Sequence, residues 1–254
     1  MLLNQQYQAS QSSRSNYSTS ALTWSRPALR PRARWSAQRS PTALFTGIVQ
    51  GQAEVKAVKR RAEFSQLTVG FPNGSLKGIQ HGASISINGT CLTVTGSTET
   101  DAYFDVIAET LRLTNLGSLQ EGSAVNFERS ARIGDEIGGH NVSGHIYTTG
   151  QITEITRTDD NRRIAIKVPS QWMKYILPKS YIAVDGISLT VGETGGDWFC
   201  IYLIPETLAI TTMGKRQEGD VLNLEIEAQT QAIVDTVERT LERMMAERGT
   251  FVKP

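Results

Sequence analysis

Two short stretches of the chain carry chemically useful side chains at matching places. Residues 87–94 read INGTCLTV and residues 184–191 read VDGISLTV, so Cys91 in the first stretch corresponds to Ser188 in the second. A thiol can act as a nucleophile, and a hydroxyl can act as one or position one. The cysteine leaves two roles open. Most cysteines in strands pack as small hydrophobic residues, and a reactive thiol must be partly exposed and have a lowered pKa.

The histidines supply the acid–base candidates. His140 and His145 lie in the stretch GGHNVSGH, and an imidazole with a reference pKa of about 6.5 exchanges protons near neutral pH. Either ring is therefore a candidate acid–base residue, while His81 is expected in a solvated loop. We do not expect a metal site, because no third histidine or thiol lies in the motif.

The likeness of the two stretches extends over a whole domain. When residues 85–128 are placed against residues 182–225, a shift of 97, 16 of 44 positions are identical without a gap. Solenoid repeats have periods of about 20–50 residues, so a shift this long indicates that each copy is a complete domain.

Short strand patterns in both copies predict antiparallel β-barrels. Segments rich in β-branched or aromatic residues occur at 53–58, 65–69, 84–87, 102–106, 163–168, 182–184 and 198–203. Glycine, asparagine or aspartate separate many of these segments, as in proteins of short strands and tight turns. We therefore predict a mostly β protein with two tandem, homologous, small antiparallel β-barrels, and a short helical turn at 171–176.

The C-terminal segment has a helical pattern instead. Apolar residues recur at Ile233, Val237, Leu241 and Met244, and charged residues occupy the other faces. This spacing predicts one amphipathic C-terminal helix. Spacing alone leaves open whether its apolar side packs on its own barrel or bundles with the same helix of other subunits.

The first 43 residues differ from the rest in composition. They are rich in serine and hold six arginines and no acidic residue. This composition predicts disorder and is typical of an organelle transit peptide, but a reading frame that starts upstream of the true start explains it equally well. We expect this extension to be cleaved or never made. The expected location is the cytoplasm, or a plastid or other organelle if residues 1–43 are a transit peptide.

The remaining composition excludes several classes. After the extension is removed, 20 basic and 25 acidic residues remain, which gives no reason to expect nucleic acid as a partner. No apolar run approaches the roughly 18 residues of a membrane span, so no membrane association is expected. Cys91 and Cys200 form no disulfide framework, and Cys200 is expected in the core. The predicted domains are an extension (1–43), a first barrel (44–131), a second barrel (132–228) and a helix with its tail (229–254).

Several motifs together resemble riboflavin synthase of the alpha-chain type, in particular its bacterial form. In chain order they are Phe45–Gly51 (FTGIVQG), Asn88–Val94 (NGTCLTV), Glu109–Leu111 (ETL), Gly138–His145 (GGHNVSGH), Asp185–Val191 (DGISLTV) and Pro205–Leu208 (PETL). The resemblance covers about residues 44–245. It implies two lumazine-binding barrels in tandem.

The resemblance implies a transferase that makes riboflavin, as the last step of riboflavin biosynthesis. Two molecules of 6,7-dimethyl-8-ribityllumazine would dismutate into riboflavin and 5-amino-6-(D-ribitylamino)uracil. The two pockets should differ where the chemistry happens, as Cys91 differs from Ser188 and Ile48 from His145. No cofactor and no metal are implied. Members of the family act as homotrimers, with each site between the first barrel of one subunit and the second barrel of its neighbour. Association with lumazine synthase is left open.

The resemblance also assigns site residues. Catalytic roles fall to His145, as the acid–base residue, and to Cys91 and Ser188, while His140 is expected to order the turn between the barrels. The substrate-binding residues implied are Phe45, Val49, Ser84, Cys91, Thr93, Thr110, Lys179, Asp185, Ser188, Thr190, Ile204 and Thr207. Phe45 either closes over the ligands or is a core aromatic residue, and Asp185 either pairs with Lys179 or orders the adjacent turn.

A non-catalytic antenna protein that binds lumazine or flavin is the alternative function. Such relatives lose side chains from the reaction site. This chain keeps Cys91, Thr93, His145, Ser188 and Thr190, which favours the enzyme.

Overall fold

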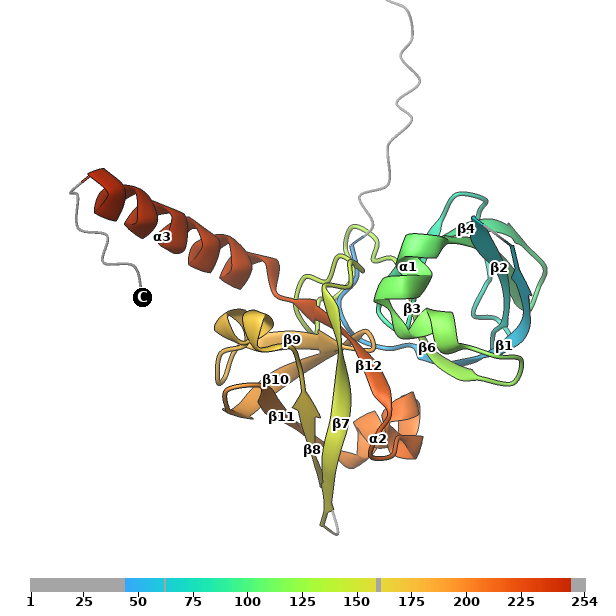
Figure 1. Ribbon diagram of the computed structural model, residues 1–254. Helices are drawn as coiled ribbons and strands as arrows, with labels where there is room; N and C mark the ends of the chain where they lie inside the picture. Colours follow the sequence, from blue (N-terminus) through green and yellow to red (C-terminus); the bar gives the residue numbers. More distant parts are fainter. Residues whose placement is uncertain (1–43, 62, 159–160, 248–254) are drawn as a thin grey trace, which may run out of the picture. The chain divides into compact units, whose positions relative to one another are not determined.

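The computed structural model describes residues 44–61, 63–158 and 161–247 (Figure 1). The predicted extension at 1–43 and the tail after residue 247 lie outside these ranges. Most of the described chain is β-structure, arranged in two successive barrels and followed by a single long helix.

Residues 51–129 form the first barrel. Its elements are β1 (Gly51–Arg60), β2 (Phe64–Gly70), β3 (Ser84–Ile87), β4 (Thr90–Ser97), β5 (Asp101–Ile107), the helix α1 (Ala108–Leu113), the 3-10 turn η1 (Asn115–Ser118) and β6 (Ala124–Arg129). Neighbouring strands pair antiparallel in the closed order β1-β2-β5-β4-β3-β6. Because the sheet closes on itself, every strand has a partner on both sides.

Residues 148–226 form the second barrel with the same plan. Its elements are β7 (Thr148–Arg157), β8 (Arg162–Lys167), the 3-10 turn η2 (Ser170–Tyr175), β9 (Tyr181–Val184), β10 (Ile187–Thr194), β11 (Trp198–Leu203), the helix α2 (Pro205–Ile210), the 3-10 turn η3 (Thr212–Lys215) and β12 (Val221–Ile226). The closed order β10-β11-β8-β7-β12-β9 repeats that of the first barrel strand for strand. The prediction of two like antiparallel barrels is confirmed, and η2 is the helical turn expected at 171–176.

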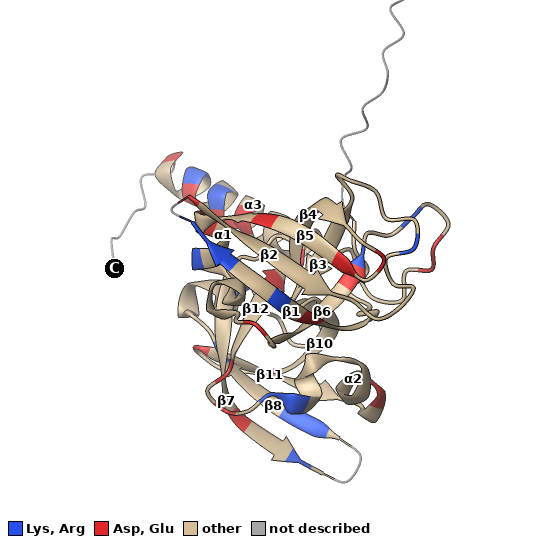
Figure 2. Ribbon diagram, turned by 90° about the vertical axis from the view of Figure 1, so that its right-hand side faces the viewer, with Lys and Arg blue, Asp and Glu red and all other residues tan. Residues whose placement is uncertain are grey.

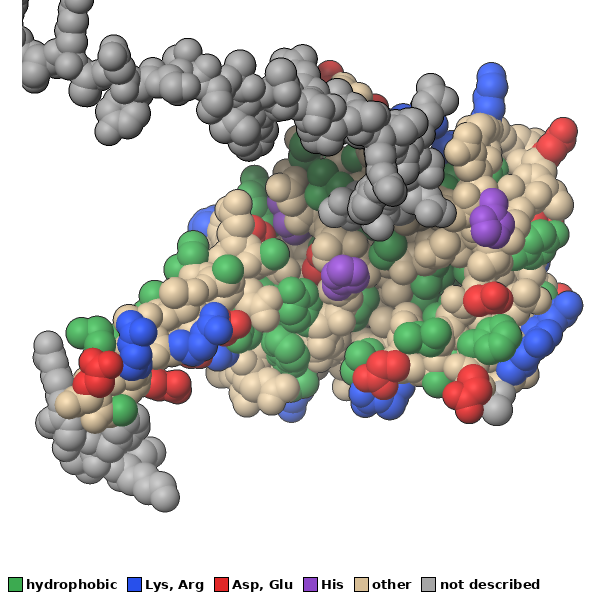
Figure 3. All heavy atoms as spheres, turned by 90° about the horizontal axis from the view of Figure 1, so that it is seen from above, with side chains coloured by type: hydrophobic (Ala, Val, Ile, Leu, Met, Phe, Trp, Pro, Cys, Tyr) green, Lys and Arg blue, Asp and Glu red, His purple; other side chains and the backbone are tan. Residues whose placement is uncertain are grey.

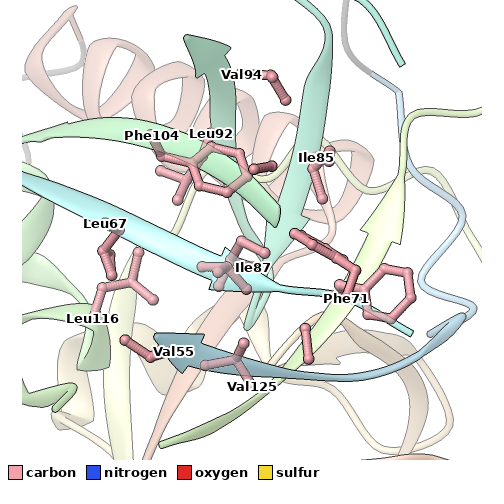
Figure 4. Close-up of a cluster of buried hydrophobic side chains, with 14 of the residues drawn as sticks. Val55, Leu67, Phe71, Ile85, Ile87, Leu92, Val94, Phe104, Leu116 and Val125 are labelled. Carbon is pink, nitrogen blue, oxygen red and sulfur yellow. The ribbon is translucent and has the colours of Figure 1, made fainter. Parts of the chain in front are cut away.

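Each barrel encloses its own hydrophobic core. In β2 every second side chain is buried, as in a strand with one face inward, and Leu67 and Val69 enter the core. Both belong to one cluster of buried side chains, and Figure 4 shows Leu67 in this cluster together with Phe104 of β5 and Ile87 of β3. A separate cluster fills the second barrel. Cys200 on β11 is fully buried, as predicted.

The two barrels contact each other through matching residues. The side-chain amide of Asn223 in β12 donates to the carbonyl of Asn88 at 2.8 Å, and that of Asn126 in β6 donates to the carbonyl of Asp185 at 3.0 Å. Each bond is the counterpart of the other under the 97-residue shift. The repeat in sequence is therefore also a repeat in the contact between the barrels.

The predicted C-terminal helix is present as α3 (Ala228–Glu247). It is tied to η2 by a hydrogen bond from the hydroxyl of Tyr175 to Asp235 and by an ion pair between Lys174 and Glu238. Its apolar stripe, however, does not pack on the barrel. The exposed fractions are 65% for Ile233, 51% for Val237, 49% for Leu241 and 41% for Met244.

Charged residues of both signs occur along the described chain. Figure 2 shows basic and acidic residues interspersed on both barrels and on α3. None of the helices in the described ranges combines the length and the apolar character that crossing a membrane requires.

Candidate active site

The hydroxyl of Ser188, on β10, lies against an imidazole. Nδ1 of His140 is 2.7 Å from Oγ of Ser188, and the imidazole ring stacks on Tyr181 with the ring centroids 5.2 Å apart. Burial lowers the pKa of His140, so the ring is neutral at neutral pH. A neutral imidazole with Nδ1 unprotonated accepts the proton of Ser188. The pair can therefore activate this hydroxyl or a water molecule beside it.

This contact extends the role predicted for His140. Its backbone N–H donates to the carbonyl of Thr46 at 3.1 Å, which fits the predicted part in ordering the turn, but its ring also reaches Ser188. His145, the predicted acid–base residue, has an exposed side chain, and its backbone N–H donates to the hydroxyl of Ser143. The two histidines therefore lie in different surroundings: His140 contacts Ser188 of the second barrel, and His145 is exposed on the loop before β7. No spacing in the sequence indicates that His140 meets a residue 48 positions away.

Two entry loops, residues 45–48 before β1 and residues 142–145 before β7, run side by side. Phe45 and Val142 form an antiparallel bridge with N···O distances of 2.8 and 3.0 Å. The Phe45 ring is fully buried there and packs in a cluster with Val142 and half-buried Cys91. Of the two roles left open for Phe45, this position matches the core aromatic residue.

Each entry loop forms a hydrogen bond with the other barrel, one at Ser188 and one at Cys91. The carbonyl of Gly47 accepts a hydrogen bond from the N–H of Ser188 at 2.8 Å, and that of Gly144 accepts one from the N–H of Cys91 at 2.9 Å. A Cβ on Gly47 would lie 2.6 Å from Cβ of Ser188, and one on Gly144 would lie 2.5 Å from Cβ of Cys91. With φ of +73° and +80°, both positions require glycine.

A buried glutamate holds each entry loop in place. Glu128 of β6 accepts hydrogen bonds from the N–H and hydroxyl of Thr46 at 2.6 and 2.8 Å and from the N–H of Gly47 at 3.0 Å. Glu225 of β12 accepts the three matching bonds from the second entry loop at 2.6, 2.8 and 2.9 Å. Burial raises the pKa of both carboxyl groups, and these donors oppose the shift. The two glutamates match under the 97-residue shift, and this was the one sequence signal for their shared role.

In the first barrel, the predicted catalytic residue Cys91 lies on β4. Its side chain is half-buried, and burial raises the pKa of the thiol, although a hydrogen bond with Ser84 opposes the shift. The thiol is therefore protonated at neutral pH, which fits a residue that lines a pocket better than an activated nucleophile. Thr93 lies two residues further along the same strand face and is exposed, and Thr110 lies half-buried on α1.

The second barrel carries an open cavity of about 770 Å³ beside β10. Five residues predicted to bind substrate line it together: Lys179, Ser188, Thr190, Ile204 and Thr207. They supply an ammonium group, hydroxyl groups and an apolar wall. Small-molecule sites commonly combine apolar surface with a few placed polar groups in this way.

Two predicted binding residues are part of the fold instead. Asp185 is fully buried and accepts hydrogen bonds from Arg216 at 2.7 Å and from the side chain of Asn115 at 2.9 Å. Burial raises the pKa of Asp185, and the Arg216 guanidinium opposes the shift. Of the two roles left open for Asp185, the pairing with Lys179 is wrong, because the carboxylate is held at the contact between the barrels. Val49 packs in the core of the second barrel.

The histidine side chains form separate patches on the face shown in Figure 3. Within residues 44–61, 63–158 and 161–247, no group of three or more His, Cys, Asp or Glu residues is arranged to hold a metal ion. The chemistry that these described residues can offer is hydrogen bonding, proton transfer and the positioning of bound molecules.

Comparison with known proteins gives relatives for both halves. A family model described as the lumazine binding domain matches residues 46–130 and 143–227. The riboflavin synthase of Escherichia coli (strain K12) is 51% identical over 211 residues, which is 82% of this chain and 99% of that protein. The riboflavin synthase of Mycobacterium bovis is 40% identical over 211 residues, which is 81% of this chain and 100% of that protein.

Solved structures of LumP are similar as well. The complex of LumP with 6,7-dimethyl-8-(1'-D-ribityl) lumazine aligns with a TM-score of 0.66 at 26% identity, covering 72% of this chain and 99% of LumP. The complex with riboflavin aligns with a TM-score of 0.67 at 28% identity over the same shares.

Each match of the family model falls on one barrel, so fold and sites together define a protein with two lumazine-binding domains in tandem. LumP and the riboflavin synthases both resemble the chain at this level. The identity to the riboflavin synthases is higher and extends over nearly their whole length. The chain belongs to the riboflavin synthase family.

Proposed function

We propose that the protein catalyses the dismutation of two molecules of 6,7-dimethyl-8-ribityllumazine into riboflavin and 5-amino-6-(D-ribitylamino)uracil. The observation that carries the proposal is a pair of like barrels with unlike residues at one matched position, Cys91 in one and Ser188 in the other. Two copies of one substrate need two similar pockets. Because one copy donates a four-carbon unit and the other receives it, the pockets must also differ in chemistry.

Positioning supplies most of the rate in this proposal. Holding two reactants in contact removes an entropic barrier of up to about 7–11 kcal/mol. Ser188 and His140 act on the lumazine in the second-barrel pocket, where the neutral imidazole takes a proton from the hydroxyl or from a water beside it. Proton transfer of this kind contributes roughly 10²–10⁴-fold. Protonated Cys91 lines the first-barrel pocket, and His145, exposed on the loop that covers Cys91, is the second acid–base group.

We also propose that the chain works as a homotrimer in which a neighbouring subunit completes each site. The stripe of α3 formed by Ile233, Val237, Leu241 and Met244 is 41–65% exposed, and a second and third copy of the helix would cover it. Ile204, on the cavity wall, is 60% exposed, and its counterpart in the first barrel, Ile107, is 61% exposed. Light scattering on the full chain should give the mass of three chains, and a monomer that is fully active would contradict the proposal.

The activity is tested with purified protein and 6,7-dimethyl-8-ribityllumazine, without any added cofactor. We expect one riboflavin to form for every two lumazines consumed, together with the aminouracil. A Ser188→Ala variant is the matched control, since it keeps the cavity and removes only the hydroxyl that His140 contacts. Binding of lumazine without conversion would identify an antenna protein of the LumP kind and would overturn the proposal.

We propose that residues 1–43 are absent from the working enzyme, because the chain enters the site directly after them through the first entry loop. N-terminal sequencing of the native protein should find a start near residue 44. Residues 1–43 intact on the active enzyme would contradict this. A cleaved extension would favour an organelle as the location, and a later start would favour the cytoplasm.

A further inference from the structure

A carboxylate network lies on the wall of the second-barrel cavity. Glu193 of β10 accepts hydrogen bonds from the hydroxyl of Tyr202 at 2.9 and 3.0 Å and from the thiol of Cys200, and Nε of Arg163 lies 3.8 Å from Oε2. These donors lower the pKa of Glu193 to about 2, the Cys200 hydrogen bond being the largest cause. The group is therefore an anion at any pH at which the protein works.

The network leaves the carboxylate of Glu193 with acceptor positions for further hydrogen bonds. A carboxylate offers about four acceptor positions, and the hydroxyl and the thiol each donate one hydrogen. Both Glu193 and Tyr202 line the cavity, and the side chain of Glu193 is 58% exposed. Among the described residues lining this cavity, Glu193 is the only carboxylate. It is thus an oriented acceptor that faces the space where a ligand would lie.

Glu193 lies at a different end of the cavity from the reactive residue. It follows Ser188 by five residues in β10, which corresponds to about 16 Å at the usual rise of a strand. The ligand proposed above has two unlike parts, a flat ring that reacts and a ribityl tail that carries only hydroxyl groups. A ring next to Ser188 would leave the tail toward the carboxylate end.

The first barrel does not repeat this arrangement. Under the 97-residue shift, Gly96 stands in place of Glu193 and Gln66 in place of Arg163. The corresponding carboxylate is Asp105 on β5, in place of Tyr202, and it accepts a hydrogen bond from Gln66 at 3.3 Å. The carboxylate is therefore on β5 in the first barrel and on β10, the counterpart of β4, in the second.

We infer that Glu193, oriented by Tyr202, is a specificity-determining residue that accepts hydrogen bonds from the polyol tail of the ligand in the second-barrel pocket. The inference rests on the proposed function. Hydroxyl groups donating to an anion form hydrogen bonds that are shorter and about twice as strong as those to a neutral acceptor. The carboxylate would therefore distinguish a ligand with a polyol from one without it, and would do so in one pocket of the two.

The test compares riboflavin with lumiflavin, which has the same ring but a methyl group in place of the ribityl tail. Binding of each flavin to the full chain is measured by fluorescence titration and fitted to two sites per chain. Glu193→Gln should weaken riboflavin at one site about tenfold, the difference between a charged and a neutral acceptor, and leave lumiflavin unchanged. Glu154→Gln is the matched control. Glu154 lies 3.6 Å from Arg163 on the same barrel but does not line the cavity.

Each outcome decides the inference. Unchanged riboflavin binding by Glu193→Gln, or equal weakening of riboflavin and lumiflavin, would overturn it. A loss as large in Glu154→Gln would assign the effect to the charge near Arg163 and would also overturn it. If Glu193→Gln fails to fold, Tyr202→Phe takes its place and should weaken riboflavin but not lumiflavin. Wild-type protein that converts lumazine separates failure of this inference from failure of the proposed function.

Discussion

The contact between the second entry loop, residues 142–145, and the first barrel leads to a quantitative prediction for Gly144. An alanine here must adopt a φ of +80°, which costs roughly 1–2 kcal/mol for an L-residue. Its Cβ would also lie 2.5 Å from Cβ of Cys91 and 2.8 Å from the backbone nitrogen of Cys91. Overpacking of this kind costs typically about 1–3 kcal/mol. The free energy of unfolding of Gly144→Ala should therefore fall by about 2–5 kcal/mol.

The chain contains a matched control that separates the two costs. Gly122 has a φ of +83°, but a Cβ added there would meet nothing within 4 Å. Gly122→Ala carries the same backbone strain, and the same restriction of the unfolded chain, without the overlap. We expect it to lose about 1–2 kcal/mol, so the difference between the variants, about 1–3 kcal/mol, measures the close approach of the loop to Cys91.

Urea unfolding of both variants measures these costs, and the lumazine assay measures their effect on the site. Gly144→Ala should also slow riboflavin formation, because moving the loop breaks the hydrogen bond between the Cys91 N–H and the Gly144 carbonyl. Gly122→Ala should retain activity wherever it is folded. If the two variants lose equal stability and Gly144→Ala stays active, the second entry loop does not press on the first barrel.

Three further predictions concern other parts of the molecule. His140→Gln should reduce the rate about 10²–10⁴-fold. In the wild type, the rate should fall as pH drops through the lowered pKa of His140, and a pH–rate profile that is the same in both proteins would contradict this. Asp185→Asn should destabilise the fold by about 3–5 kcal/mol because Arg216 loses its buried partner. The first barrel has Asn88 and Leu119 at the positions that match Asp185 and Arg216. Adding Arg216→Leu to Asp185→Asn recreates this pair and should recover most of the lost free energy of unfolding, as measured by urea unfolding. Leu241→Glu should dissociate the proposed trimer in light scattering, and a mass unchanged from wild type would exclude α3 from the interface.

Much of the fold follows from local patterns. The alternation of Leu67 and Val69 with half-exposed neighbours indicates a strand with one face inward. The 97-residue shift then indicates two copies of one domain. The sequence did not place the two six-residue helices, because α1 and α2 are too short to show a helical period and have no fully buried residue. The alternatives for α3 could not be separated by spacing either, since the same stripe suits a barrel or another helix.

For the candidate site, the motifs predicted some residues correctly and others wrongly. Lys179, Ser188, Thr190, Ile204 and Thr207 were expected from the motifs and line one cavity. Asp185 and Val49 were expected beside them but belong to the barrel contact and the core. Residue type and position in a motif do not reveal which way a side chain faces once two sheets have closed and met.

The sequence by itself determined the strands, the duplication and the motifs of the site, because these depend on neighbouring residues and on comparison of one half with the other. Only the tertiary structure decided that His140 meets Ser188, that each entry loop covers the opposite barrel, and that Asp185 pairs with Arg216. These contacts join residues 31 to 141 positions apart. Barrel closure and the docking of one barrel on the other bring such residues together, and no local pattern records that geometry.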